Sequence, residues 1–317
     1  TDMYTAGPTL PGTFGASSPM GNYADMTTRG WELTLSWNDA FDMGGKPFNY
    51  GIVATLGDYQ SWIDKYNNDT MSLGGVGATL YGRQPEFYNG MKLGEIWGFV
   101  TEGIFQTEEE VANSPVPDKS MIEPNSLSGK YGVGDLKFKD LDGNGKIDVG
   151  ENTVDNPGDR KIIGNSNPRY NYSFRLTGDW NGFFLSAFFQ GVGHQDWGTG
   201  AENSLFWGLF TKPYTPITRY VADNYWTEEN RDAYFPKLTG YVGGAYQRQA
   251  IVAQTRYLQN IGYIRLKNLQ IGYTLPEKVT QKANIAKASL FVSMDNLWSW
   301  SPLYKHEQSF DVQSVNG

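Results

Sequence analysis

Residues 31–38 read Trp-Glu-Leu-Thr-Leu-Ser-Trp-Asn, and this stretch decides the fold class. Trp31, Leu33, Leu35 and Trp37 alternate with polar residues. A period of two is typical of a β-strand with one apolar and one polar face. The two tryptophans lie about 20 Å apart along such a strand, which suits aromatic side chains at both edges of an apolar slab.

Further segments with the same alternation, or with a compact apolar run, predict an all-β protein. They are 48–57, 170–177, 183–190, 257–275 and 290–294. The segment 257–275 carries two apolar phases, and a bulge near Lys267 would reconcile them. Residues 1–28 are rich in Gly, Pro, Ser and Thr, so we expect a loop there.

The connections between the predicted strands alternate in length. Those at 39–46, 178–182 and 276–287 are short, whereas those at 58–169 and 191–256 are long. Outer-membrane β-barrels have short periplasmic turns and long extracellular loops. The pattern therefore predicts a transmembrane antiparallel β-barrel, provided that 58–169 holds an even number of crossings. A soluble β-sandwich also alternates polar and apolar residues, but it carries loops of this length less readily.

Composition excludes several classes of protein. The chain has 317 residues and no cysteine, so it has neither a disulfide framework nor a thiolate metal site. Its net charge of -8 argues against nucleic-acid binding. No apolar run has the length of a membrane-spanning helix. Because the chain starts at Thr1, we expect a processed or truncated product.

Residues 140–151 form the most specific chemical motif. Asp140, Asp142, Asn144, Asp148 and Glu151 occupy positions 1, 3, 5, 9 and 12 of a twelve-residue loop, and Lys146 offers its carbonyl group at position 7. This is the ligand spacing of a calcium-binding loop, with Gly145 at the sharp turn. The sequence therefore predicts bound Ca²⁺. The alternative is an Asx-rich surface turn that binds no metal.

The flanks of this loop indicate what the cation would do. Leu136 and Phe138 alternate with charged residues and predict a strand, and no helical pattern follows Glu151. A calcium sensor needs a pair of helices that can open. We therefore expect a structural clamp.

The long segment 191–256 is rich in aromatic residues. Trp197, Trp207 and Trp226 are candidates for stacking on sugar rings or gripping peptide side chains. The alternative is that they pack the segment against itself and its neighbours, since an ordered loop of this size needs its own small core.

No pattern of an enzyme is present. The only histidines are His194 and His306, and the motifs of zinc proteases, serine hydrolases and P-loop enzymes are missing. Glu228 and Glu229 are more readily explained as surface acids than as a glycosidase pair.

Several motifs, in order and spacing, resemble the C-terminal half of SusC/RagA-family TonB-linked outer-membrane transporters. The similar segments span roughly 28–298 and include 28–33, 103–107, 134–148, 162–165, 168–170, 189–193, 225–230, 263–273 and 295–297. The resemblance implies part of a barrel of roughly 22 strands, with extracellular loops at about 58–169 and 191–256. It also implies an N-terminal plug domain, which has no counterpart in residues 1–317, and a closing strand that is missing before Gly317.

The resemblance further implies a function and its partners. Family members import oligosaccharides or peptides across the bacterial outer membrane, with a SusD-like surface lipoprotein as lid and TonB as the source of energy. Nutrient import is thus the expected function. A soluble, calcium-stabilised carbohydrate-binding module is the alternative, because it would share the calcium loop and the aromatic residues.

Overall fold

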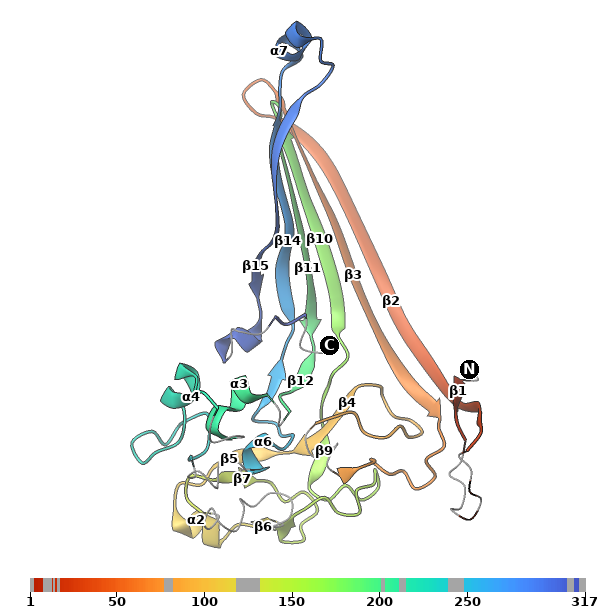
Figure 1. Cartoon of the computed structure of the whole chain (residues 1–317), viewed down its shortest axis with the longest axis vertical. Helices are drawn as coiled ribbons and strands as arrows, with labels where there is room; N and C mark the ends of the chain where they lie inside the picture. The colour runs from red at the N-terminus through yellow and green to blue at the C-terminus, as the bar shows by residue number, and fades with distance from the viewer. Residues whose placement is uncertain are drawn as a thin grey trace.

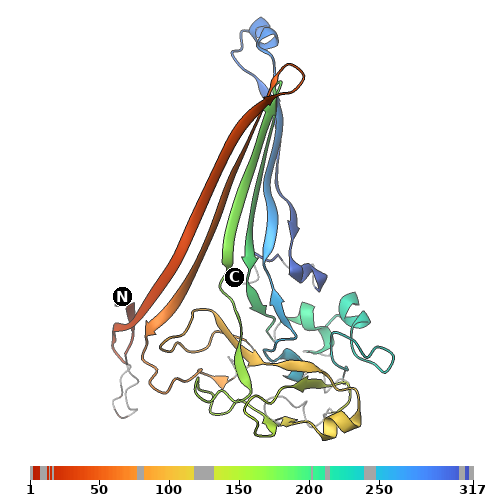
Figure 2. The ribbon, with the colours of Figure 1, turned by 180° about the vertical axis from the view of Figure 1, so that it is seen from behind.

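The computed structural model describes residues 3–7, 13, 15, 18–76, 82–117, 132–200, 203–210, 215–238, 248–306 and 311–313. Within them the largest element is an antiparallel sheet with the strand order β1-β2-β3-β10-β11-β14-β15. Its strands are β1 (Met3–Ala6), β2 (Met20–Asp42), β3 (Pro47–Lys65), β10 (Arg169–Trp180), β11 (Phe183–His194), β14 (Tyr263–Thr274) and β15 (Ser289–Trp300). The long strands run side by side from a narrow end to a broad body at the bottom of Figure 1, and Figure 2 shows the same arrangement from behind.

The register of this sheet places apolar and polar side chains on opposite faces. One row across the strands contains Leu35, Ala54, Phe174, Phe189, Leu266 and Trp298. The next row contains Thr34, Thr55, Ser173, Gln190, Arg265 and Ser299. We call these the apolar face and the polar face. The apolar face is uncovered, since Leu35 is 61% and Leu290 is 73% exposed.

The connections follow the predicted alternation of lengths. Turns at 43–46, 181–182 and 275–288 join strands at the narrow end, whereas 66–168 and 195–262 form the body at the other end. β3 pairs directly with β10, so 66–168 adds no strand between them. The two-residue turn uses Asn181 and Gly182 at φ 49° and 88°, the left-handed pair that tight hairpins need.

Two local predictions had different outcomes. The bulge is confirmed, because the β14 register shifts between Leu266 and Asn268 and thereby keeps Leu266 and Leu269 on one face. The prediction of a loop over 1–28 is wrong in part. β2 begins at Met20 and pairs with β1, so strand pairing outweighs the weak local strand preference of this polar segment.

The body consists of small elements around an aromatic core. It contains β4 (Glu95–Phe99), β5 (Thr101–Ile104), β6 (Val116–Pro117), β7 (Leu136–Phe138), β8 (Lys146–Ile147), β9 (Arg160–Asn165), β12 (Asp196–Gly198) and β13 (Leu258–Asn260). Its helices are α2 (Glu108–Ala112), α3 (Ser204–Trp207), η2 (Gly208–Phe210), α4 (Arg219–Asp223) and α6 (Arg248–Ile251). The core brings together Phe99, Leu136, Ile147, Trp207, Phe235 and Tyr257 from both long connections.

Helices elsewhere are equally short: α7 (Glu277–Thr280) and η3 (Gln281–Ala283) lie in the last turn at the narrow end, and η4 (Pro302–Lys305) follows β15. Among the described residues, none of the helices has the length and apolar character needed to cross a membrane. The predicted all-β class is confirmed.

Candidate functional site

The acidic loop lies in the body, directly after β7. β7 pairs with β5, and β8 pairs in parallel with β6. Ile147 and Val149 point into the aromatic core and are 1% and 6% exposed. Residues 141–146, by contrast, are exposed, so their side chains lie away from the core.

Backbone hydrogen bonds shape the first half of the loop. The two carboxylate oxygens of Asp140 accept bonds from the amides of Gly143 at 2.6 Å and Gly145 at 2.9 Å. The Asn144 side chain accepts a bond from the Lys146 amide at 2.7 Å. Gly145 has φ 78°, a left-handed conformation that favours glycine. The hydrogen bond from Gly145 is the main reason that the pKa of Asp140 is lowered.

Three carboxylates meet in this loop, and the third is Asp159. Ligand oxygens of Asp140, Asp142 and Asp159 all lie within 4.8 Å of one another. Such a separation lets one cation with Ca²⁺–O distances of about 2.4 Å contact all three. Glu151, the predicted ligand at position 12, is exposed and is not part of the group. Asp148 instead accepts a hydrogen bond from the Gly150 amide at 2.7 Å.

Asp159 reaches the group because residues 150–158 leave the loop and return to it. A Cβ atom on Gly158 would lie 2.4 Å from the Gly150 amide nitrogen, so only glycine permits this close approach. Asp159 then accepts hydrogen bonds from the amides of Leu141 at 2.7 Å and Asp148 at 2.8 Å. In the sequence, the glycines at positions 150 and 158, which flank a turn-rich segment, are the signal that could have identified Asp159 as part of the group.

The Asp159 carboxylate is fully buried. Burial raises its pKa, and the charges of Asp142 and Asp140 act in the same direction, against the two backbone hydrogen bonds. A buried carboxylate beside two others is costly unless a cation offsets the charge. The donor set and its electrostatics therefore fit a hard divalent cation.

Arg160 closes the excursion from within the body. It is 2% exposed and donates hydrogen bonds to the Asn152 side chain at 2.8 Å and to the carbonyl groups of Val149 and Pro157 at 3.2 Å. Burial lowers the pKa of Arg160 to about 10. Its fixed guanidinium holds both ends of 150–158 in place behind Asp159.

Asp135 joins the two long connections beneath the loop. It is fully buried and accepts hydrogen bonds from the Gly132 amide at 2.7 Å and Gln249 at 2.6 Å. The Lys237 ammonium lies 3.2 Å from Oδ2 of Asp135, the oxygen that also accepts the bond from Gly132, and forms an ion pair with it. Burial raises the pKa of Asp135 although Lys237 opposes the shift. Asp135 thus links the segment that precedes the acidic loop to residues 237 and 249 of the second long connection.

The tryptophans predicted to contact substrate lie elsewhere than expected. Trp207 is 1% and Trp226 is 8% exposed, and both pack in the aromatic core. Stacking on a sugar needs an open ring face, which neither ring offers, so the prediction of stacking is wrong for these two. Trp197 is partly buried against Ile261, Leu303 and Val312. Packing of the long connection against itself and against neighbouring segments accounts for these rings.

No protein-family model matches the chain. Curated relatives include TonB-dependent receptor P3 of Formosa agariphila, 25% identical over 304 residues that cover 92% of this chain and 26% of the receptor. TonB-dependent receptor P39 of the same organism is 25% identical over 328 residues, which cover 92% of this chain and 28% of that receptor. The chain thus spans about a quarter of the length of these relatives.

Solved structures share the fold. The structure of the RagAB peptide transporter matches 95% of this chain and 28% of that chain, with a TM-score of 0.59 and 18% identity. The RagAB peptide importer in its open-open state matches with the same values. These similarities support the resemblance that the sequence motifs indicated: over 92% of its length the chain is similar in sequence to TonB-dependent receptors, and its fold is similar to part of RagAB. Receptors of this kind are outer-membrane proteins.

Proposed function

We propose that this chain is part of the wall of a membrane-spanning β-barrel in a TonB-dependent importer of oligosaccharide or peptide nutrients. The observation that carries the proposal is the two-faced antiparallel sheet, with short turns at one end and the folded body at the other. The uncovered apolar face would contact lipid, and the polar face would line the lumen.

The dimensions of the apolar face support this orientation. On β15 exposed apolar residues extend from Leu290 to Trp300, which are 73% and 54% exposed. Ten residues of strand measure about 33 Å, and a tilt of about 45° reduces this to about 23 Å along the membrane normal. Outer-membrane barrels carry an apolar band about 25 Å tall.

A pair of neighbouring substitutions in the full-length parent protein tests the proposal. Leu35→Arg puts a charge on the apolar face, where the cost near the middle of the bilayer is about 2–4 kcal/mol. Thr34→Arg puts the same charge on the polar face and serves as the control. We expect Leu35→Arg, but not Thr34→Arg, to reduce the heat-modifiable form recovered from outer membranes. Wild-type protein that is soluble, or equal effects of the two substitutions, would contradict the proposal.

Partners follow from the same assignment. The body formed by 66–168 and 195–262 would face the cell exterior and contact a SusD-like surface lipoprotein. Energy from TonB would act through parts of the receptor outside this chain. Purification of the full-length parent from native outer membranes, without a co-purifying surface lipoprotein, would contradict the proposed complex.

We also propose that the loop at 140–159 binds Ca²⁺ as a structural clamp. Asp140, Asp142 and Asp159 would supply carboxylate oxygens, and Asn144 and the Lys146 carbonyl group would complete the shell. The buried Asp159 supports this proposal, since a cation offsets the repulsion among the three carboxylates. No reaction is proposed, because the relatives are receptors and transporters.

A further inference from the structure

A hollow of about 670 Å³ opens at the sheet, near the strand ends that lead into the body. Five strands that lie side by side contribute to its wall: β2, β3, β10, β11 and β14. The register places Glu32, Thr55, Asn171, Gln190 and Tyr263 on the polar face. Its volume is that of a small-molecule site.

The side chains of this hollow have hydrogen-bonding capacity to spare. Thr55 and Ser173 bond to each other at 2.7 Å. Among the described residues of this chain, the side-chain amides of Asn171 and Gln190 make no hydrogen bond. Glu32 extends over Gly57, where a Cβ atom would lie 3.8 Å from the Glu32 Cγ atom. These groups offer donors, acceptors and one carboxylate to a ligand.

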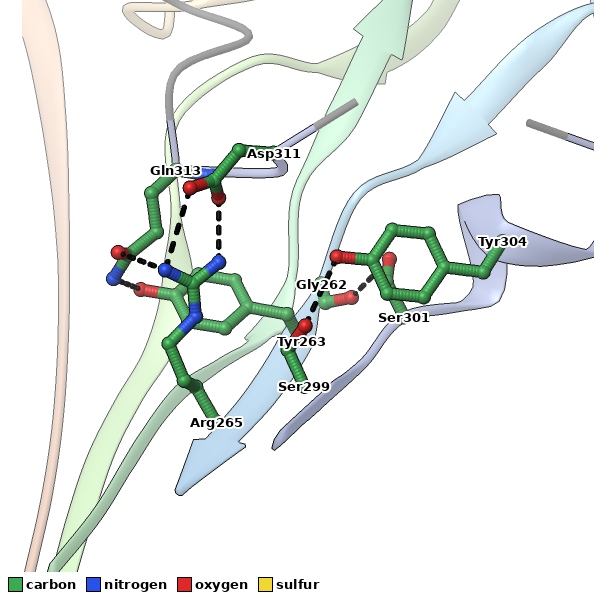
Figure 3. A network of polar contacts seen from close by, with 8 residues as sticks. All are labelled: Gly262, Tyr263, Arg265, Ser299, Ser301, Tyr304, Asp311 and Gln313. Atoms are coloured by element: carbon green, nitrogen blue, oxygen red, sulfur yellow. Dashed lines mark hydrogen bonds and ion pairs between the residues drawn. The ribbon is translucent and has the colours of Figure 1, made fainter. Parts of the chain in front are cut away.

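Most charges around the hollow are neutralised by the chain itself. Arg169 binds Asp58 with two hydrogen bonds of 2.7 and 2.5 Å. Arg265, opposite Gln190 in the sheet, binds Asp311 at 2.5 Å and Gln313 at 2.8 Å, and Gln313 in turn bonds to the Tyr263 hydroxyl (Figure 3). These contacts occupy two cations that could otherwise bind an acidic ligand.

Two other charged side chains, Arg175 and Glu32, lie at different heights along the polar face. Arg175 lies one step further toward the narrow end, with its guanidinium 5.4 Å from the centre of the Phe188 ring, and it does not line the hollow. Glu32 lines the hollow and, as far as the structure describes the chain, has no ion pair. The charge that a ligand meets in the hollow is therefore negative.

Building on the proposed function, we propose that this hollow is a ligand subsite for an uncharged, hydroxyl- or amide-bearing ligand, and that Glu32 excludes ligands with a carboxylate. Two like charges about 5 Å apart correspond to a roughly fourfold loss of affinity in water-like surroundings, and to a larger loss where water is partly excluded. Asn171 and Gln190 hold the ligand through their free amides.

The test uses the full-length parent protein in detergent and isothermal titration calorimetry. The probes are a neutral glucose hexasaccharide, the same hexasaccharide oxidised to glucuronic acid, and a Gly/Ser hexapeptide with both termini blocked. The two neutral probes distinguish sugar hydroxyl groups from peptide amides as the source of the binding chemistry. We expect one neutral probe to bind at least fourfold more tightly than the acidic probe.

Three variants assign the effect to residues. Glu32→Gln should bring the neutral and acidic affinities within about twofold, whereas Asp295→Asn, a carboxylate on the same face outside the hollow, should leave the difference intact. Asn171→Ala combined with Gln190→Ala should weaken neutral binding about tenfold or more. Binding of neither neutral probe, equal binding of all probes, or an unchanged difference in Glu32→Gln overturns the subsite. If the protein is nevertheless located in the outer membrane and heat-modifiable, these results contradict the subsite alone. If the protein is soluble, the proposed function is contradicted as well.

Discussion

Replacing Asp159 by Asn tests the calcium clamp where structure and sequence spacing differ. The spacing names Glu151 as the closing ligand, whereas the structure brings Asp159 to Asp140 and Asp142. Asp159→Asn keeps the size of the side chain and removes its charge. Glu151→Gln makes the same chemical change on an exposed side chain outside the group and is the matched control.

The expected magnitude has two parts. Two unit charges about 4 Å apart interact by about 1 kcal/mol in water, so loss of one charge beside a divalent cation costs about 2 kcal/mol, or roughly 30-fold in affinity. Asp159 also accepts two backbone hydrogen bonds, from Leu141 and Asp148. An amide has one acceptor oxygen, so one backbone amide loses its partner at a cost of about 1–3 kcal/mol.

Calorimetric titration of Ca²⁺ into chelator-treated, full-length parent protein measures the effect. We expect at least 30-fold weaker binding for Asp159→Asn and less than threefold weaker binding for Glu151→Gln. Limited proteolysis gives a second readout, since Ca²⁺ should protect residues 140–159 in the wild type and not in Asp159→Asn. Equal weakening by both substitutions would refute the assignment of Asp159, and a wild type that binds no Ca²⁺ would refute the clamp.

Three further predictions concern stability. The His306 ring stacks on the Tyr234 ring with 4.6 Å between centroids and forms a hydrogen bond of 2.6 Å with the Tyr220 hydroxyl. Burial lowers the pKa of His306. Its contribution to stability is therefore present above pH ~6.5 and is lost as the pH falls through the pKa of His306 in the folded state. Protection factors in 215–238, corrected for the intrinsic pH dependence of amide exchange, should be lower at pH 5 than at pH 7.5, and a His306→Phe variant that keeps this difference would contradict the assignment. Asp135→Ala leaves Lys237 and Gln249 without their carboxylate and should destabilise the body by about 3–5 kcal/mol. We expect faster hydrogen exchange in 132–138 and 248–257, while the sheet stays heat-modifiable. Asp135→Asn should destabilise the body less. Gly182→Ala places a Cβ atom 2.7 Å from the Thr274 carbonyl oxygen at φ 88° and should cost about 1–2 kcal/mol in urea unfolding, whereas Gly178→Ala, where the nearest atom is 3.5 Å away, should cost less.

The features that the sequence by itself determined are local ones. Alternate side chains of a strand point to opposite faces, so the run from Trp31 to Asn38 predicts both faces of β2 without knowledge of its neighbours. The bulge near Lys267 follows from the same rule, because the apolar phase changes within one strand. The sequence likewise predicts a tight hairpin at 178–182, and the structure narrows the turn to Asn181 and Gly182, two residues that tolerate positive φ.

Tertiary structure alone decided the features that depend on distant segments meeting. Asp159 becomes the third carboxylate because Gly150 and Gly158 touch, and the ligand spacing from Asp140 does not report that contact. In the sequence, Trp207 and Trp226 do not differ from tryptophans that bind ligands at a surface. Whether their rings are buried depends on which surfaces the two long connections bring together. The hollow beside Glu32 likewise exists only after five strands align, since pairing and packing are long-range interactions and strand alternation is a short-range one.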